Sequence, residues 1–114
     1  MPMKRIEAII RPEKMEDVKQ GLVDSGHPEL TLYQVQGHST ETGIVHRWRG
    51  HEYPVDLLPE VAVVLMADDQ EVSAIVDVIA QSARTHRAGD GTIFVTPVEQ
   101  VIRVHTGETG ANSL

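Results

Sequence analysis

The sequence predicts an α+β fold in which two helices cover one face of a four-stranded antiparallel sheet. The chain has 114 residues, the length of one domain, and 40% of them are hydrophobic. Each half of the chain follows the order strand, helix, strand. Two such units in series give the βαββαβ order of the ferredoxin-like arrangement. We therefore expect a single domain over residues 1–114.

The first half of the chain opens with a strand at residues 3–10, where apolar and polar side chains alternate. Pro12 ends this strand. Residues 13–25 carry apolar side chains at helical spacing, which predicts an amphipathic helix, and Gly26 is well placed to end it. Residues 30–36 then predict the second strand.

The second half of the chain repeats this order. Residues 61–66 form an uninterrupted apolar run, typical of a strand buried on both faces. An apolar stripe that starts at Val72 and recurs with helical spacing predicts the second helix, which we expect residues 89–91 (Gly-Asp-Gly) to end. Residues 92–96 predict the fourth strand, and residues 98–104 a short further strand or turn.

Two helices can cover only one face of such a sheet. Val, Ile and Leu occupy both faces of the predicted strands, so the second face would expose apolar surface to water. We therefore expect further copies of the chain to cover it.

Residues 37–59 connect the second and third strands, and they show neither helical nor strand periodicity. A hairpin connection needs only two to five residues, and loops as long as this one are usually functional or disordered. Trp48 and Tyr53 in this segment indicate contact with a partner, because neutral surface insertions tend to be polar. A tolerated surface insertion is the alternative.

Composition excludes several classes of protein. A net charge of −7 and only four aromatic residues argue against nucleic-acid binding. The absence of cysteine excludes disulfides, thiolate metal sites and a cysteine nucleophile. No apolar stretch reaches the roughly 20 residues of a membrane span, and the N-terminus does not read as a signal peptide. We expect a cytoplasmic protein.

The segment 84–92 (Arg-Thr-His-Arg-Ala-Gly-Asp-Gly-Thr) is a candidate anion site. Its arginines and glycines could present positive charge and backbone N–H groups to an anion. The alternative is a plain turn, since Asp-Gly is a common turn signal and arginine near a helix end complements the helix dipole. The residues alone leave both interpretations open.

Neither a metal centre nor a catalytic centre is predicted. His38, His46 and His51 share the long loop with Glu41 and Glu52, but their spacing matches no established metal motif. Six histidines scattered through loops are more often solvated. No triad or carboxylate pair can be defended from spacing, so we expect that the chain is not an enzyme.

Four segments carry motifs that together cover nearly the whole chain. Residues 3–12 read MKRIEAIIRP, residues 49–59 RGHEYPVDLLP, residues 89–95 GDGTIFV and residues 103–108 RVHTGE. In order, they resemble the first strand, the second half of the long T-loop, the B-loop and the C-terminal segment of the P-II signal-transduction (nitrogen regulatory) family. The chain resembles a divergent member of that family.

The resemblance implies a βαββαβ homotrimer with a T-loop at about residues 37–59, a B-loop at about 84–92 and a C-terminal segment at 103–114. It also implies adenine-nucleotide binding in the clefts between subunits. The T-loop would dock onto a membrane transporter or a metabolic enzyme, without insertion of the chain into the membrane.

By matching position, the resemblance assigns the nucleotide contacts to Thr31, Gly37, Thr85, Arg87, Gly89, Asp90, Gly91, Thr92, Arg103 and His105. In the T-loop it assigns effector and partner contacts to Glu41, Arg49 and Tyr53. Tyr53 occupies the position that some family members modify with a nucleotidyl group.

The chain departs from the family pattern at the phosphate site. Glu60 and Thr92 stand where the family usually has lysines, and His105 where it has an arginine, so the site is four charge units less positive. We therefore predict that ADP or AMP is favoured over ATP. Glu41 replaces a glutamine of the 2-oxoglutarate site, and a carboxylate there would repel that anion.

Three other functions remain in view. P-II-like offshoots that handle inorganic carbon bind bicarbonate with adenine nucleotide, and a small monoanion suits a site with fewer cations. A trimeric metal-tolerance protein of related fold would need the histidines to converge. An acylphosphatase-like hydrolase, the least favoured, needs a glycine-rich anion loop after the first strand, and residues 11–15 hold no glycine.

Overall fold

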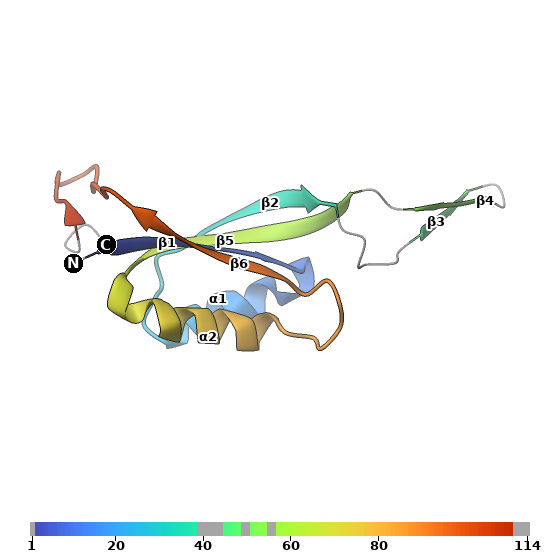
Figure 1. Ribbon diagram of the computed structural model, residues 1–114, viewed down its shortest axis with the longest axis horizontal. Coiled ribbons are helices and arrows are strands. Elements are labelled where there is room, and N and C mark those ends of the chain that lie inside the picture. The colour runs from blue at the N-terminus through green and yellow to red at the C-terminus, as the bar shows by residue number, and fades with distance from the viewer. Residues whose placement is uncertain (1, 39–44, 49–50, 55–56, 111–114) are drawn as a thin grey trace.

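Two helices lie on one face of a four-stranded antiparallel sheet in the computed structural model of the protein (Figure 1). The structure describes residues 2–38, 45–48, 51–54 and 57–110, and for residues 45–48 and 51–54 it describes the backbone alone. The sheet order is β2-β5-β1-β6, in which the first strand of each half lies at the centre. This order confirms the predicted ferredoxin-like fold.

The elements are β1 (Met3–Ile10), the 3-10 turn η1 (Pro12–Lys14), α1 (Met15–Asp24), β2 (Thr31–Gly37), β3 (Val45–Trp48), β4 (His51–Pro54), β5 (Leu58–Asp68), the 3-10 turn η2 (Asp69–Glu71), α2 (Val72–Ala83) and β6 (Gly91–Val98).

The core lies between the sheet and the two helices. Ile6 of β1, Val63 of β5, Leu22 of α1, and Ile75 and Ile79 of α2 are fully buried there. Burial of each such side chain contributes about 1.5–3 kcal/mol of hydrophobic stabilisation. The apolar stripe of α2 and the buried run of β5 both follow the sequence prediction.

The T-loop contains regular structure that the sequence did not predict. β3 and β4 pair as a two-stranded antiparallel ladder in which Val45 lies opposite Pro54 and Trp48 opposite His51. Each strand has four residues of mixed character, so neither carries enough alternation to be recognised. In Figure 1 the ladder extends far from the main sheet. β5 also begins three residues earlier than predicted, at Leu58.

The second helix ends earlier than predicted. We expected residues 89–91 to end α2, but its last residue is Ala83. The reason is local: the Asp90 carboxylate accepts hydrogen bonds from the N–H groups of Thr85 and His86, which holds these residues in a turn outside the helix. Gly26, by contrast, ends α1 as expected, with φ +93° and the neighbouring His27 N–H bonded to Leu22 O at 2.8 Å.

The fourth strand is longer than predicted, and the residues that follow it form a small hairpin. β6 runs to Val98 and includes Pro97, which a strand at the edge of a sheet can accommodate. After β6 the chain folds back on itself: Ile102 bridges Thr109, and the Arg103 N–H donates to the Glu108 carbonyl at 2.8 Å. The predicted short strand or turn at 98–104 is therefore the first arm of a small hairpin.

The sheet face opposite the helices is open in the single chain (Figure 1). Arg5 and Glu7 form an ion pair of 2.6 Å on β1, and the Tyr33 hydroxyl donates to the Glu7 carboxylate at 3.2 Å. Phe94 of β6 lies opposite Glu7 and is half exposed. This face thus combines apolar side chains with a paired charge, and nothing in the described chain covers it.

Neither α1 nor α2 is long and apolar enough to span a membrane, and the described residues contain no other α-helix.

Candidate functional site

The B-loop is folded around the carboxylate of Asp90. This carboxylate accepts hydrogen bonds from the N–H of Thr85 at 2.8 Å, from the N–H of His86 at 3.1 Å and from the Thr85 hydroxyl. Arg11, directly after β1, donates its Nε–H to the same carboxylate at 3.1 Å and its Nη2–H to the Ala88 carbonyl at 2.6 Å. Asp90 and Arg11 therefore fix the shape of the loop.

These hydrogen bonds hold the pKa of the Asp90 carboxyl well below its usual range. The largest cause is the Thr85 hydroxyl, and the Thr85 N–H and the Arg11 guanidinium add to it. A carboxylate whose folded pKa is lowered stabilises the native state above its unfolded pKa of about 3.9, and that stabilisation is lost as the pH falls toward the folded pKa.

We predict that Asp90→Asn lowers Tm at pH 7 and that the gap to wild type narrows below about pH 4, where Asp90 of the unfolded wild-type chain takes up a proton while Asp90 of the folded chain stays ionised. Thermal unfolding followed by circular dichroism from pH 7 to pH 2 measures this. Asp77→Asn on α2, an exposed carboxylate without a partner in the described chain, is the control and should give no such convergence. A gap for Asp90→Asn that stays constant with pH would contradict the prediction.

The B-loop keeps a few groups available for an anion. Arg84 and Arg87 are exposed and have no acidic partner among the described residues. Within the same part of the chain, no acceptor takes the N–H of Gly89. The two sequence interpretations of this segment are therefore compatible: Asp90 builds a turn, and the cations and the glycine backbone remain beside it.

The end of β2 lies beside the B-loop end of the sheet. Gly37 pairs with Leu58 at the start of β5, and a Cβ at Gly37 would overlap the carboxylate of Glu60. Arg11, Leu58, Glu60 and Gly89 line a cavity of about 320 Å³ with Pro12, Glu13 and Pro59; we call it the Glu60 cavity.

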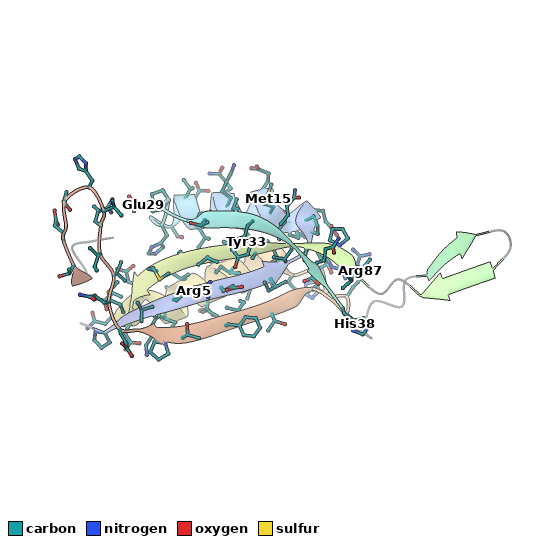
Figure 2. The ribbon with its side chains drawn as sticks, turned by 90° about the horizontal axis from the view of Figure 1, so that it is seen from above. Arg5, Met15, Glu29, Tyr33, His38 and Arg87 are labelled. Atoms are coloured by element: carbon teal, nitrogen blue, oxygen red, sulfur yellow. The ribbon has the colours of Figure 1, made fainter. Side chains whose placement is uncertain are left out.

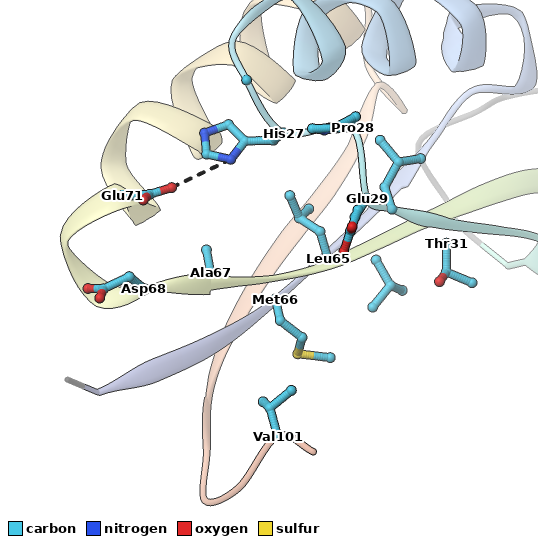
Figure 3. Close-up of a pocket in the computed structure, with 13 residues that line it drawn as sticks. His27, Pro28, Glu29, Thr31, Leu65, Met66, Ala67, Asp68, Glu71 and Val101 are labelled. Carbon is cyan, nitrogen blue, oxygen red and sulfur yellow. Dashed lines mark ion pairs between the residues drawn. The ribbon is translucent and has the colours of Figure 1, made fainter. Parts of the chain in front are cut away.

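A second cavity, of about 840 Å³, lies toward the other end of the sheet (Figure 3). We call it the Thr31 cavity. The turn between α1 and β2, the last residues of β5, and Val101 line it, and a His27–Glu71 contact of 3.5 Å lies at its rim. Arg103 is anchored next to it, because its Nη2 lies 3.3 Å from the carboxylate of Glu29, a lining residue.

The predicted nucleotide contacts form two separate groups on one chain. β6 separates them, because the B-loop precedes Gly91 and the C-terminal segment follows Val98, and eight strand residues span about 25 Å. Figure 2 shows Arg87 and Glu29 near opposite ends of the sheet. At the B-loop end lie Gly37, Thr85, Arg87, Gly89, Asp90, Gly91 and Thr92; beyond the other end of β6 lies Arg103, with the exposed His105 on the same C-terminal hairpin. Thr31 begins β2 near the middle of the sheet, opposite Val64, and lines the same cavity as Glu29, the partner of Arg103.

A single site that contains both groups therefore needs two chains. Strand geometry keeps the two ends of the sheet apart within one subunit, and no described segment carries Arg103 back to the B-loop.

The T-loop predictions fall largely outside the described residues. Glu41 and Arg49 lie outside them altogether, as does the Tyr53 side chain; the Tyr53 backbone lies in β4 opposite His46. In the described part of the chain, no three His, Asp or Glu side chains converge on a common point as metal ligands.

Two residues that shape the site were not predicted from the sequence. Arg11 entered the sequence analysis only as part of the segment 3–12 that resembles the family's first strand and as part of the glycine-free stretch 11–15, yet in the structure it holds the B-loop. The register of the sheet carries a usable signal, because Ile10 lies opposite Gly91 and the next residue must therefore approach the B-loop. Glu29, the partner of Arg103, has no comparable sequence signal: the two residues are 74 positions apart.

The family model described as "Nitrogen regulatory protein P-II" matches residues 3–108. The Nitrogen regulatory protein P-II of Nostoc punctiforme is 45% identical over 112 residues, which cover 98% of this chain and all of the relative. Nitrogen regulatory protein P-II 2 of Methanothermobacter thermautotrophicus is 41% identical over 98% of this chain and 97% of the relative. The Azospirillum brasilense P-II protein is 43% identical over 98% of this chain and all of its own length.

The fold is also found in a solved structure, that of Arabidopsis thaliana PII bound to citrate. It superposes with a TM-score of 0.82 at 29% identity, over 99% of this chain and 92% of the plant protein.

Proposed function

The chain belongs to the nitrogen regulatory protein P-II family, and from this we propose that it is a signalling protein that binds adenine nucleotide in clefts between the subunits of a homotrimer. P-II proteins are regulators of signal transduction and not enzymes, in agreement with the sequence prediction. In this proposal the chain acts in the cytoplasm, and its T-loop docks onto a membrane transporter or a metabolic enzyme.

The observation that carries the proposal is the separation of the two groups of predicted contacts. The B-loop offers Arg84, Arg87 and the Gly89 backbone, whereas Arg103 lies with the Thr31 cavity at the other end of the sheet. A trimer would place the B-loop end of one subunit against the C-terminal hairpin of the next. The open sheet face supports the trimer, since other copies would cover Phe94 and its neighbours.

The nucleotide preference follows from charge. Glu60 lines the cavity next to Gly89, Thr92 is exposed on β6, and neither supplies the positive charge that the family usually has at these positions. A hydrogen bond to a charged group contributes about 1.5–3 kcal/mol, so each missing cation weakens the hold on an additional phosphate. ADP and AMP carry less phosphate charge than ATP and lose less.

We predict that isothermal titration of the full-length protein with ADP, AMP and ATP gives a lower Kd for ADP or AMP than for ATP. The titration is run at two salt concentrations, because phosphate contacts weaken with ionic strength. Tight ATP binding with no signal from ADP or AMP would contradict the charge argument. No binding of any of the three would overturn the proposed function itself.

Bicarbonate sensing together with adenine nucleotide is the second candidate. The four lost charge units favour it, because a monoanion needs fewer cations than the dianion 2-oxoglutarate. The modification of Tyr53 and the effector contacts of Glu41 and Arg49 also remain proposals, and the family resemblance alone supports them.

A further inference from the structure

A third cavity, of about 270 Å³, lies between the end of α2 and the start of β6; we call it the α2–β6 cavity. Its floor is apolar and contains Ile79, Ala80, Ala83 and Ile93, whereas Arg84 and Asp90 of the B-loop lie at its polar edge. β6 is an edge strand, so no further strand of the described chain lies beyond it. An apolar centre with a polar rim is the usual anatomy of a protein–protein interface.

The C-terminal hairpin presents apolar side chains to solvent. Val104 is 98% exposed and Ile102 55%, which makes them the two most exposed large apolar side chains among the described residues. Val104 stands between Arg103 and His105, both of which the family resemblance assigns to the nucleotide site. Burial of exposed apolar surface is favourable, so this hairpin is a candidate for contact with a partner.

Val104 cannot reach the α2–β6 cavity of its own chain. The cavity lies at the start of β6, whereas the hairpin follows Val98 at the end of that strand, about 25 Å away. Figure 1 shows the loop before β6 and the hairpin after it at opposite ends of the strand. The hairpin is closed by the 2.8 Å hydrogen bond from the Arg103 N–H to the Glu108 carbonyl. Only the hairpin of another copy can reach the cavity.

The proposed trimer brings these two surfaces to the same place. It joins the B-loop of one subunit to the hairpin of the next, and the B-loop forms the edge of the α2–β6 cavity. Val104 is the neighbour of Arg103, and consecutive Cα atoms are about 3.8 Å apart. A hairpin that carries Arg103 to the B-loop therefore carries an exposed valine toward the apolar floor beside it.

A small polar ligand fits the α2–β6 cavity less well than an apolar side chain. The Asp90 carboxylate at its edge already accepts hydrogen bonds from Thr85, His86 and Arg11, which occupy its acceptor sites. The apolar floor therefore dominates what the cavity can bind.

We propose that Val104 of one subunit docks into the α2–β6 cavity of the next. The contact would hold the hairpin against the neighbouring B-loop, so Val104 is a positioning residue for Arg103. The inference rests on the trimer of the proposed function, and it adds the pair of surfaces through which the two subunits meet beside the nucleotide.

An engineered disulfide tests this contact without reference to nucleotide. The chain has no cysteine, so Val104→Cys combined with Ala80→Cys introduces its only two thiols. A disulfide needs Cα atoms about 4.4–6.8 Å apart, which the length of β6 excludes within one chain. We expect mild oxidation of the full-length protein to give covalently linked dimers and trimers on a non-reducing gel, which a reducing agent converts to single chains.

Val104→Cys combined with Ala74→Cys is the matched control. Ala74 is an exposed alanine on the same helix and does not line the cavity. This pair, and Val104→Cys alone, should remain single chains under the same oxidation. Cross-linking of either control to the same extent as the Ala80 pair would mean that the hairpin meets its neighbours at random. That result, or an Ala80 pair that stays uncross-linked, would overturn the proposal.

The positioning role has its own test. Val104→Asn removes the apolar contact without adding a charge that would repel phosphate, whereas Val104→Ile keeps the contact. Because Val104 is exposed in the single chain, neither change should disturb the fold of the subunit. We expect calorimetric titration to give a Kd for ADP about tenfold higher for Val104→Asn, and a wild-type value for Val104→Ile. An unchanged Kd for Val104→Asn would contradict the positioning role.

The two experiments separate this inference from the proposed function. ADP binding by wild type without cross-linking of the Ala80 pair would overturn the docking of Val104 and leave nucleotide binding in place. Cross-linking of the Ala80 pair in a protein that binds no ADP would confirm the docking and overturn the nucleotide function.

Discussion

Replacement of Gly91 by alanine is expected to lower the free energy of unfolding by about 3 kcal/mol or more. Gly91 begins β6 with φ +128°, a conformation that residues with a side chain rarely adopt. A Cβ there would overlap the carbonyl oxygen of Ile9 in the neighbouring strand, and backbone cannot move aside as a flexible side chain can. Urea denaturation followed by circular dichroism measures the loss.

Gly26→Ala is the matched control for this prediction. Gly26 also has a positive φ, +93°, but a Cβ there would meet nothing within 4 Å. Only the backbone conformation is penalised, which costs about 1–2 kcal/mol. Equal losses in the two variants would mean that the contact with β1 has no role at Gly91.

Replacement of Arg103 by alanine is expected to weaken nucleotide binding by about 10- to 100-fold, the equivalent of one charge-assisted hydrogen bond. The loss of stability should be small, about 0–1 kcal/mol, because the Arg103–Glu29 ion pair is exposed to solvent. Calorimetric titration with ADP, together with Tm, separates the two effects.

Glu29→Gln is the control variant for Arg103. It removes the partner charge and leaves the guanidinium, so ADP affinity should stay the same or rise. If Glu29→Gln weakens binding as much as Arg103→Ala, the ion pair matters for the shape of the Thr31 cavity and Arg103 does not contact the nucleotide.

Periodicity was enough to predict the framework of the fold. The stripe that begins at Val72 and the apolar run at 61–66 are the buried faces of α2 and β5. These elements could be predicted because the hydrophobic pattern of a long segment extends over many residues. The short strands of the T-loop were missed for the opposite reason. Val45–Trp48 and His51–Pro54 are defined by pairing with each other and carry no pattern of their own.

The details of the candidate site depended on contacts between distant residues. Asp90 was recognised as part of a motif, but its role in ending α2 at Ala83 depends on hydrogen bonds that no local pattern encodes. The same holds for Arg11, which reaches Asp90 across 79 positions of the chain. Glu60 was recognised as an unusual charge, whereas its fit against Gly37 emerged only from the register of β2 and β5.

The central claim is that each nucleotide site combines the B-loop of one subunit with the C-terminal hairpin of the next. Mixing subunits that carry Arg87→Ala with subunits that carry Arg103→Ala tests it most directly. Each variant alone should bind ADP weakly, whereas random mixed trimers should regain about a quarter of the wild-type sites, since some neighbours then pair an intact B-loop with an intact hairpin. If the mixture binds no better than either variant alone, the two groups do not meet across subunits and the account is wrong.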